Sequence, residues 1–167
     1  MDVLDLMKSR RSIRKYDGRS VEEEKLTRVL EAGRLAPSAR NMQEWKFVVV
    51  RGSRLASLAQ ACNGQQMVQE AGTAIVVCAT ENHMMGCGQP SATVDCSIAL
   101  SFMLLEAQEQ GLGMCWLGAF SAPAVKTALA LPEDWTPVAV SPLGYPAESP
   151  AARPRKTLEE LTVYLTD

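Results

Sequence analysis

Apolar residues recur at helical spacing in several stretches of the chain, and each stretch predicts a helix. Val3, Leu6 and Met7 predict a first helix over 2–10, and the S-V-E-E sequence from Ser20 predicts a capping box that begins a second. Further helices are expected over 54–62, over about 94–110, from Ser121 with its following Pro123, and in a short last turn capped over 157–160.

Continuous apolar runs between these stretches predict strands over 46–51, 74–79, 115–120 and 137–141. Runs without polar alternation are typical of strands that are covered on both faces. Because predicted helices and strands alternate along the chain, the pattern indicates either the α/β or the α+β class.

Two stretches depart from the ordinary amphipathic pattern. The predicted helix over 94–110 is apolar on most sides and ends at Gly111, so we expect it in the centre of the fold or at a dimer interface. The stretch 146–155 is rich in proline and alanine, and we expect it to be extended with few internal contacts.

Composition narrows the class of protein. The 167 residues suit one domain, and an apolar fraction of 47% with 22% charged residues is typical of a soluble globular chain. The net charge of −2 gives no positive field for nucleic acid, and no apolar run approaches the roughly 20 residues that span a membrane. The acidic start does not resemble a signal peptide, and five cysteines without paired spacing argue against a disulfide framework, so we expect a cytoplasmic protein.

Basic residues near both ends of the chain are candidates for phosphate binding. In an extended segment Arg10, Ser12 and Arg14 point the same way, and two guanidinium groups with a hydroxyl suit a phosphate. A second basic cluster over 153–156 could meet the first around one phosphate. Taken alone, each cluster is better explained as solvated surface charge.

Two further segments could approach a flat ligand. In 36–45, small residues permit a close backbone approach, and Asn41 and Gln43 offer amides for the edge of a heterocycle. In 111–118 a G-x-G closes a helix and opens a strand, the reverse of the dinucleotide-binding order, while Gly118 could leave backbone N–H groups facing a ligand. Taken alone, the first segment is better explained as a polar loop.

Metal and hydrolase sites find little support in the sequence. His83 is the only histidine, and the cysteines follow no usual zinc spacing. No G-x-S-x-G sequence is present. We therefore expect no metal site and no Ser or Cys hydrolase triad.

Taken together, these segments resemble the nitroreductase family over residues 3–160. The motifs that carry the resemblance are R-R-S-I-R from Arg10, A-P-S-A-x-N-x-Q from Ala36, the stretch from Asp95 through G-L-G-x-C-W-L-G to Gly118, and L-G-Y-P from Leu143 with the later R-K. The resemblance implies an α+β fold in which helices flank a mostly antiparallel central sheet. It also implies one domain over 1–167, a homodimer with FMN at the subunit interface, and a tail over about 146–167 that contacts the partner.

The resemblance also implies which residues hold the cofactor. The expected FMN contacts are Arg10, Arg11, Ser12, Arg14, Pro37, Ser38, Ala39, Asn41, Gln65, Leu117, Gly118 and Arg155. Of these, residues 37–41 approach the flavin from the other subunit, Gln65 lies near the pyrimidine ring, and the Leu117 and Gly118 amides lie near flavin N5 and O4.

The implied activity is hydride transfer from NAD(P)H, through flavin N5, to a nitroaromatic, quinone or similar small-molecule acceptor by ping-pong turnover. The flavin carries the chemistry, so no catalytic side chain is expected. Glu44 stands where the family often has proline, which places an acid near the flavin loop. The alternatives are another FMN oxidoreductase reaction, a flavin-binding or storage protein without strong NAD(P)H turnover, and a non-flavin interaction protein.

Overall fold

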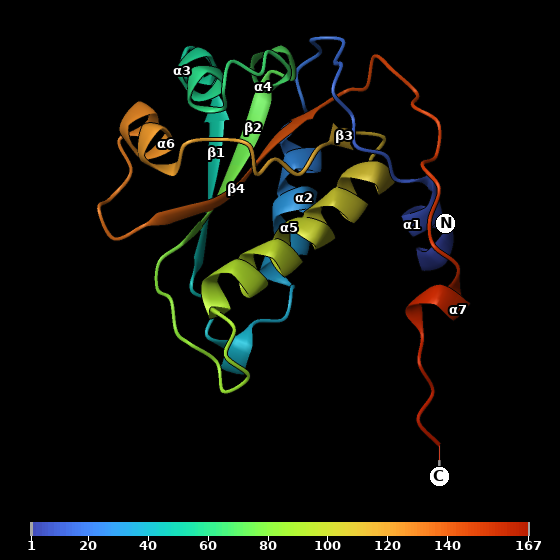
Figure 1. The fold of residues 1–167 in the computed structure, drawn as a ribbon. Coiled ribbons are helices and arrows are strands. Elements are labelled where there is room, and N and C mark those ends of the chain that lie inside the picture. The colour runs from blue at the N-terminus through green and yellow to red at the C-terminus, as the bar shows by residue number, and fades with distance from the viewer. Residues whose placement is uncertain (1, 167) are drawn as a thin grey trace.

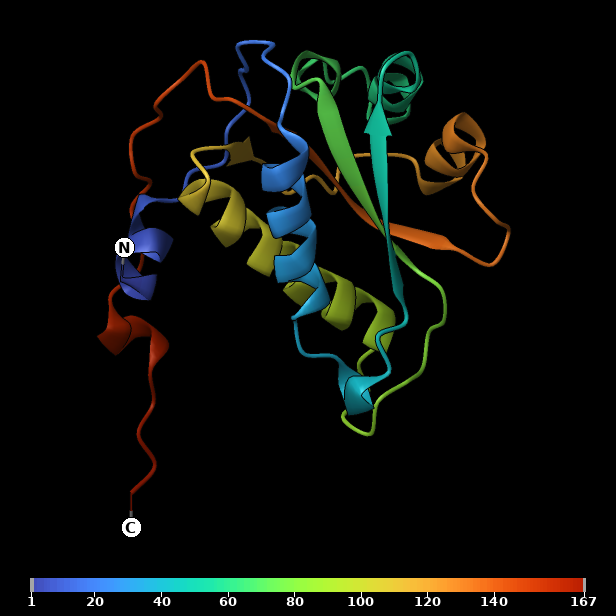
Figure 2. The same ribbon diagram turned by 180° about the vertical axis from the view of Figure 1, so that it is seen from behind.

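The computed structural model of the chain describes residues 2–166 (Figures 1 and 2). Its helices are α1 (Val3–Ser9), α2 (Glu23–Arg34), α3 (Arg54–Ala61), α4 (Met67–Glu70), α5 (Ser91–Glu109), α6 (Ala122–Leu129) and α7 (Leu158–Leu161), with a 3₁₀ turn, η1, at Ala39–Asn41. One antiparallel sheet in the order β1-β2-β4-β3 is formed by β1 (Trp45–Arg51), β2 (Thr73–Ala79), β4 (Thr136–Gly144) and β3 (Gly113–Met114). The class is α+β, as the resemblance implies.

The interior strand β2 is buried along its whole length because helices cover both faces of the sheet. Ile75 and Val77 belong to an apolar cluster that includes residues of α2 and α5. Val76 and Cys78, which point the opposite way, belong to a second cluster with residues of α3 and α6. A strand in this position needs apolar residues at every position, which explains the continuous run in the sequence.

Helix α5 runs diagonally in front of α2 in Figure 1, and the two helices pack against each other. Leu100 and Met103 are fully buried on it. A Cβ on Gly33 of α2 would lie 2.1 Å from the Met103 methyl carbon, so this glycine allows the two helices to approach closely. The long apolar stretch of the sequence is therefore central to the fold, although the helix begins at Ser91, earlier than predicted.

The prediction that Ser20 begins the second helix is wrong. The helix begins at Glu23, and its N-cap residue is Glu22, which makes no side-chain capping bond. Val21 is buried in the core, and the Glu22 carboxylate accepts hydrogen bonds from the Tyr145 hydroxyl at 2.7 and 2.9 Å. Tertiary contacts on both residues outweigh the local capping preference of Ser20.

The prediction of a strand over 115–120 is also wrong. Strand β3 covers only Gly113–Met114, and pairing resumes at a single bridge between Leu117 and Val140. The register of β3 against β4 continues to place Cys115 opposite Pro142. Proline has no N–H to donate, so the ladder is interrupted there.

Most other elements follow the prediction. Strands β1, β2 and β4 and helices α1, α3 and α6 lie within a few residues of their expected ranges, and the Thr157–Glu160 capping box is present at α7. The turn η1 and helix α4 are short elements that the pattern did not indicate. None of the helices within residues 2–166 combines the length and apolar character that a membrane crossing requires.

Candidate functional site

Residues 10–17, which follow α1, form an extended strap along the edge of the sheet. Ser12 forms a bridge to Met114 of β3, and the Ile13 amide donates to the Met114 carbonyl at 3.1 Å. Ile13 is buried, and a Cβ on Gly113 would lie 2.7 Å from the Ile13 Cβ, so the glycine makes room for it. Because Ile13 points into the protein, its neighbours along an extended chain point away from the core.

The tail that follows β4, residues 145–156, returns antiparallel to the strap. Three hydrogen bonds join the two segments: Asp17 N–H to Tyr145 O at 3.1 Å, Ala147 N–H to Lys15 O at 2.9 Å, and Arg11 Nε to Pro150 O at 3.2 Å. In a fourth bond, the Arg14 backbone amide donates to the Glu148 carboxylate at 2.6 Å. The pairing brings the two basic clusters of the sequence together.

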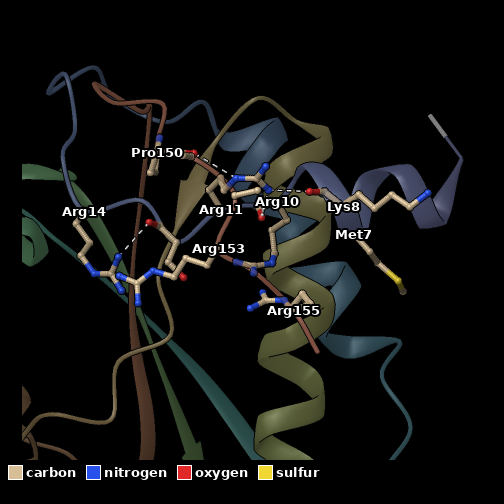
Figure 3. Close-up of a pocket in the computed structure, with 11 residues that line it drawn as sticks. Met7, Lys8, Arg10, Arg11, Arg14, Pro150, Arg153 and Arg155 are labelled. Carbon is tan, nitrogen blue, oxygen red and sulfur yellow. Dashed lines mark hydrogen bonds between the residues drawn. The ribbon is translucent and has the colours of Figure 1, made fainter. Parts of the chain in front are cut away.

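Strap and tail enclose a cavity of about 610 Å³, the arginine pocket (Figure 3). Its lining is Met7, Lys8, Arg10, Arg11, Ser12, Arg14, Pro150, Ala151, Ala152, Arg153 and Arg155. No carboxylate lines it, and within residues 2–166 none of its five guanidinium groups forms an ion pair. Uncompensated guanidinium groups that converge with a hydroxyl suit a phosphate, because each can offer paired N–H donors.

Arg11 differs from the other arginines of the pocket because its guanidinium group binds four backbone carbonyls, whereas that of Arg14 binds only the Ser12 carbonyl, at 3.4 Å. Its Nη1 donates to the carbonyls of Lys8 at 2.7 Å and of Ser9 and Arg10 at 3.0 Å, while its Nε bonds to Pro150. The carbonyls of Lys8, Ser9 and Arg10 lie at the C-terminal end of α1, where a cation is favourable. Arg11 therefore holds the helix end and the tail together at the wall of the arginine pocket.

A second cavity of about 610 Å³ shares Arg14 with the arginine pocket. It is lined by Arg14, Lys15, Tyr16, Gln65, Gln66, Met67, Glu70 and Ala147. Gln65 comes from the turn before α4, and its Nε2 donates to the Ala119 carbonyl at 3.0 Å. Burial raises the pKa of Tyr16, whose hydroxyl donates to the Ile13 carbonyl at 2.8 Å, so this phenol stays neutral.

A third cavity of about 390 Å³ lies on the other side of Arg10 and Ser12, against Ser101, Leu104 and Leu105 of α5 and Trp116. The Leu117 amide donates to the Val140 carbonyl at 2.9 Å and is committed to the sheet. Within residues 2–166 the Gly118 amide has no protein acceptor. A Cβ on Gly118 would lie 3.0 Å from the Trp116 ring, so glycine avoids a close contact with this ring.

The loop with Pro37, Ser38, Ala39 and Asn41 lies elsewhere in the same chain. It sits beside the N-terminal end of α5, whereas the strap and tail pass the C-terminal end (Figures 1 and 2). The Ala39 amide donates to the Asp95 carboxylate on α5. One chain therefore brings together the strap, the tail and Gln65, but not this loop.

Four polar residues near these cavities or the loop were not among the predicted site residues. Lys8 lines the arginine pocket, Lys15 lines the second cavity, Glu148 binds the Arg14 amide, and Asp95 binds the Ala39 amide. The basic run of the strap was a usable signal for Lys15. No local signal marks Glu148 or Asp95, because their partners lie 134 and 56 residues away in the sequence.

Comparison with known proteins shows the family to which the chain is related. The family model described as the nitroreductase family matches residues 7–86 and 60–145, which together span most of the chain. This chain belongs to the nitroreductase family. The sequence prediction of the family is thereby confirmed.

Individual nitroreductases resemble the chain over most of its length. A putative NADH dehydrogenase/NAD(P)H nitroreductase of Methanothermobacter thermautotrophicus is 39% identical over 159 residues, which cover 92% of this chain and 82% of that protein. The crystal structure of a protein with the same description from Bacteroides thetaiotaomicron has a TM-score of 0.86 at 32% identity and covers 98% of this chain and 97% of its own. An FMN-dependent nitroreductase of Clostridium difficile has a TM-score of 0.83 at 30% identity, with 98% and 99% covered.

Proposed function

We propose that the protein is an FMN-dependent oxidoreductase that uses NAD(P)H as its co-substrate and reduces a small-molecule acceptor such as a nitroaromatic or a quinone. The observation that carries the proposal is the arginine pocket, with five guanidinium groups from two ends of the chain and no ion pair within residues 2–166. The second cavity, which shares Arg14 with this pocket, is lined by Gln65, whose amide offers donors for a heterocycle edge beyond a phosphate. This donor set fits FMN.

The residues of the pocket bind and orient the cofactor. Arg10, Ser12 and Arg155 hold the phosphate through charge-assisted hydrogen bonds, with Arg153 beside them. When bound, FMN would supply the redox chemistry that links NAD(P)H to the acceptor. Arg14, which lines two cavities, would place positive charge beside the flavin, where it would favour the reduced state.

Backbone groups complete the proposed flavin contacts. Gly118 is the better donor of the pair expected at N5 and O4, because the Leu117 amide already bonds to Val140. Gln65, which lines the second cavity from the turn before α4, would contact the pyrimidine edge. No side chain acts as an acid or base in this proposal, since solvent can supply the protons.

We propose that the enzyme is a cytoplasmic homodimer with FMN at the subunit interface. The loop with Pro37, Ser38, Ala39 and Asn41 lies at the far end of α5 from the arginine pocket of its own chain, so it serves the partner's flavin. The single domain over 1–167 then contacts the partner through its tail over about 146–167: residues up to 156 lie along the strap of their own chain, and the part that follows reaches the partner. The high exposure of Tyr164 (83%) and Leu165 (94%) in an isolated chain supports this, because apolar side chains gain by being covered.

An absorbance spectrum of the purified protein, before and after FMN is added and the excess removed, tests the proposal. We expect close to one yellow chromophore per chain that NAD(P)H bleaches under anaerobic conditions. Arg155→Ala should weaken FMN retention, whereas Arg34→Ala should not, because Arg34 pairs with Glu31 on the remote surface of α2. A folded protein that stays colourless with added FMN overturns the proposal.

A further inference from the structure

The loop around η1 has an unusual backbone. Arg40, Asn41 and Gln43 have φ values of 52°, 57° and 54°, in the left-handed region that side chains other than glycine seldom adopt. Three such residues within four positions are strained unless surrounding contacts hold them. The loop is also exposed, so packing contributes little to fixing its shape.

A buried carboxylate on α5 accepts a hydrogen bond from the loop. Asp95 is 7% exposed on α5, and each of its two oxygens lies 3.1 Å from the Ala39 amide nitrogen, at the first residue of η1. No cation pairs with Asp95 within residues 2–166. A buried carboxylate is costly to keep without a partner, so its bond to this amide has a specific use.

The remaining bonds of the loop are internal, apart from one in which the Gln43 carbonyl accepts from the Trp45 amide at the start of β1, at 2.9 Å. The Ser38 hydroxyl accepts from the Gln43 amide at 3.0 Å, and the Gln43 side chain donates to the Asn41 carbonyl at 3.1 Å. These bonds close the loop on itself but do not fix its position on the protein. Asp95 attaches it to α5, the long central helix of the fold.

We infer that Asp95 is a positioning residue that holds the 38–43 loop in its strained shape before the flavin arrives. The inference rests on the proposed function, in which Ser38, Ala39 and Asn41 approach the partner's cofactor. Helix α5 then contacts both the loop and the cavity beside Arg10. Asp95 lies near the start of the helix, and Ser101, Leu104 and Leu105 of its later turns line that cavity. A loop that is already shaped loses less conformational freedom when it binds.

Amide hydrogen exchange in the FMN-free protein tests this directly. Asp95→Ala should speed exchange in 38–43 while exchange in β2 stays unchanged, and Asp95→Asn, which keeps one acceptor oxygen, should fall between it and the wild type. Affinity for FMN should fall on the order of tenfold in Asp95→Ala and less in Asp95→Asn.

A glycine substitution provides a second, independent readout. Arg40→Gly should recover part of the lost FMN affinity in the Asp95→Ala background, because glycine adopts the required φ without strain. The matched control is Ala130→Gly, which relieves a similar φ of 53° at the end of α6, and it should recover none.

The outcomes separate this inference from the proposed function. If the wild type binds no FMN, the proposed function fails, and exchange in 38–43 still reports on Asp95. If folded Asp95→Ala exchanges in 38–43 as the wild type does, the inference is wrong. Should Asp95→Ala not fold, Asp95→Asn decides the question in the same way: faster exchange in 38–43 supports the inference, and unchanged exchange overturns it.

Discussion

At the scale of single residues, neighbouring arginines of one basic motif have different surroundings. Arg10 directs its side chain into the arginine pocket, whereas Arg11 donates to four backbone carbonyls. The first has charge available for a ligand and the second uses its charge within the fold. A substitution at each position should therefore affect a different property.

Arg11→Ala should lower the free energy of unfolding by about 1–3 kcal/mol, because hydrogen bonds from a charged donor are lost at the end of α1 and at Pro150. Arg10→Ala should change stability less and weaken FMN binding more. Urea unfolding and FMN titration of both variants make the comparison. Equal effects of the two substitutions on both properties would contradict this division.

The cysteines divide into buried and exposed thiols. Burial raises the pKa of Cys62 to about 11 and of Cys78 and Cys96 to about 12, and it also raises that of Cys115, whereas Cys87 is exposed. Because the thiolate is the reactive form, iodoacetamide at pH 8 should label the folded protein at Cys87 alone. Mass spectrometry of the native and the urea-unfolded protein checks this, and rapid native labelling of a second cysteine would refute it.

The same thiols predict a loss of stability at alkaline pH. Their pKa in the unfolded chain is near 9.0, so above this pH the unfolded chain releases protons that the folded chain keeps. Their contribution is fully present below pH 9 and decreases as the pH rises toward 11 to 12, by up to about 1.4 kcal/mol per pH unit for each thiol. Urea unfolding at pH 8 and pH 10 measures the decrease, and Cys78→Ala should make it smaller.

At the scale of elements, a glycine at the end of β4 controls how closely neighbouring segments approach. A Cβ on Gly144 would lie 2.7 Å from the Ala71 carbonyl oxygen and 2.9 Å from the Tyr16 ring. The backbone oxygen cannot rotate away, so Gly144→Ala should destabilise the fold by about 1–3 kcal/mol. Gly86→Ala is the control, because nothing lies within 4 Å of its Cβ position. Similar unfolding midpoints for the two variants would show that the contact is relieved at little cost.

At the scale of the whole molecule, the tail beyond the arginine pocket has little to cover it in one chain. Leu158, Leu161, Val163, Tyr164 and Leu165 are all at least 64% exposed, and the segment extends away from the body (Figure 1). Removal of residues 157–167 leaves Arg155 in place and should weaken the proposed dimer. Sedimentation of the shortened chain over a range of concentrations should show a raised dimer dissociation constant, and an unchanged one would exclude a role for these residues.

Much of the architecture was predictable because local pattern and tertiary environment agree. The continuous apolar run of β2 reflects helices on both faces, and the all-round apolar stretch of α5 reflects its central place. The alternation of Arg10, Ser12 and Arg14 predicted a shared direction, and all three line one pocket. These features depend on side-chain periodicity, which the sequence contains in full.

Only the tertiary structure decided features that depend on distant partners. Pro142 interrupts the third strand because the fold places it opposite Cys115, and Tyr145 engages Glu22 across 123 residues of sequence. The strap and the tail form one pocket through hydrogen bonds between the two ends of the chain. The Asp95 carboxylate accepts a hydrogen bond from the Ala39 amide, which lies 56 residues earlier in the sequence. The sequence by itself determined most of the elements, the family and the basic residues. Which of those residues are available to a ligand was decided by long-range pairing, because pattern encodes the direction of a side chain but not the partner it meets.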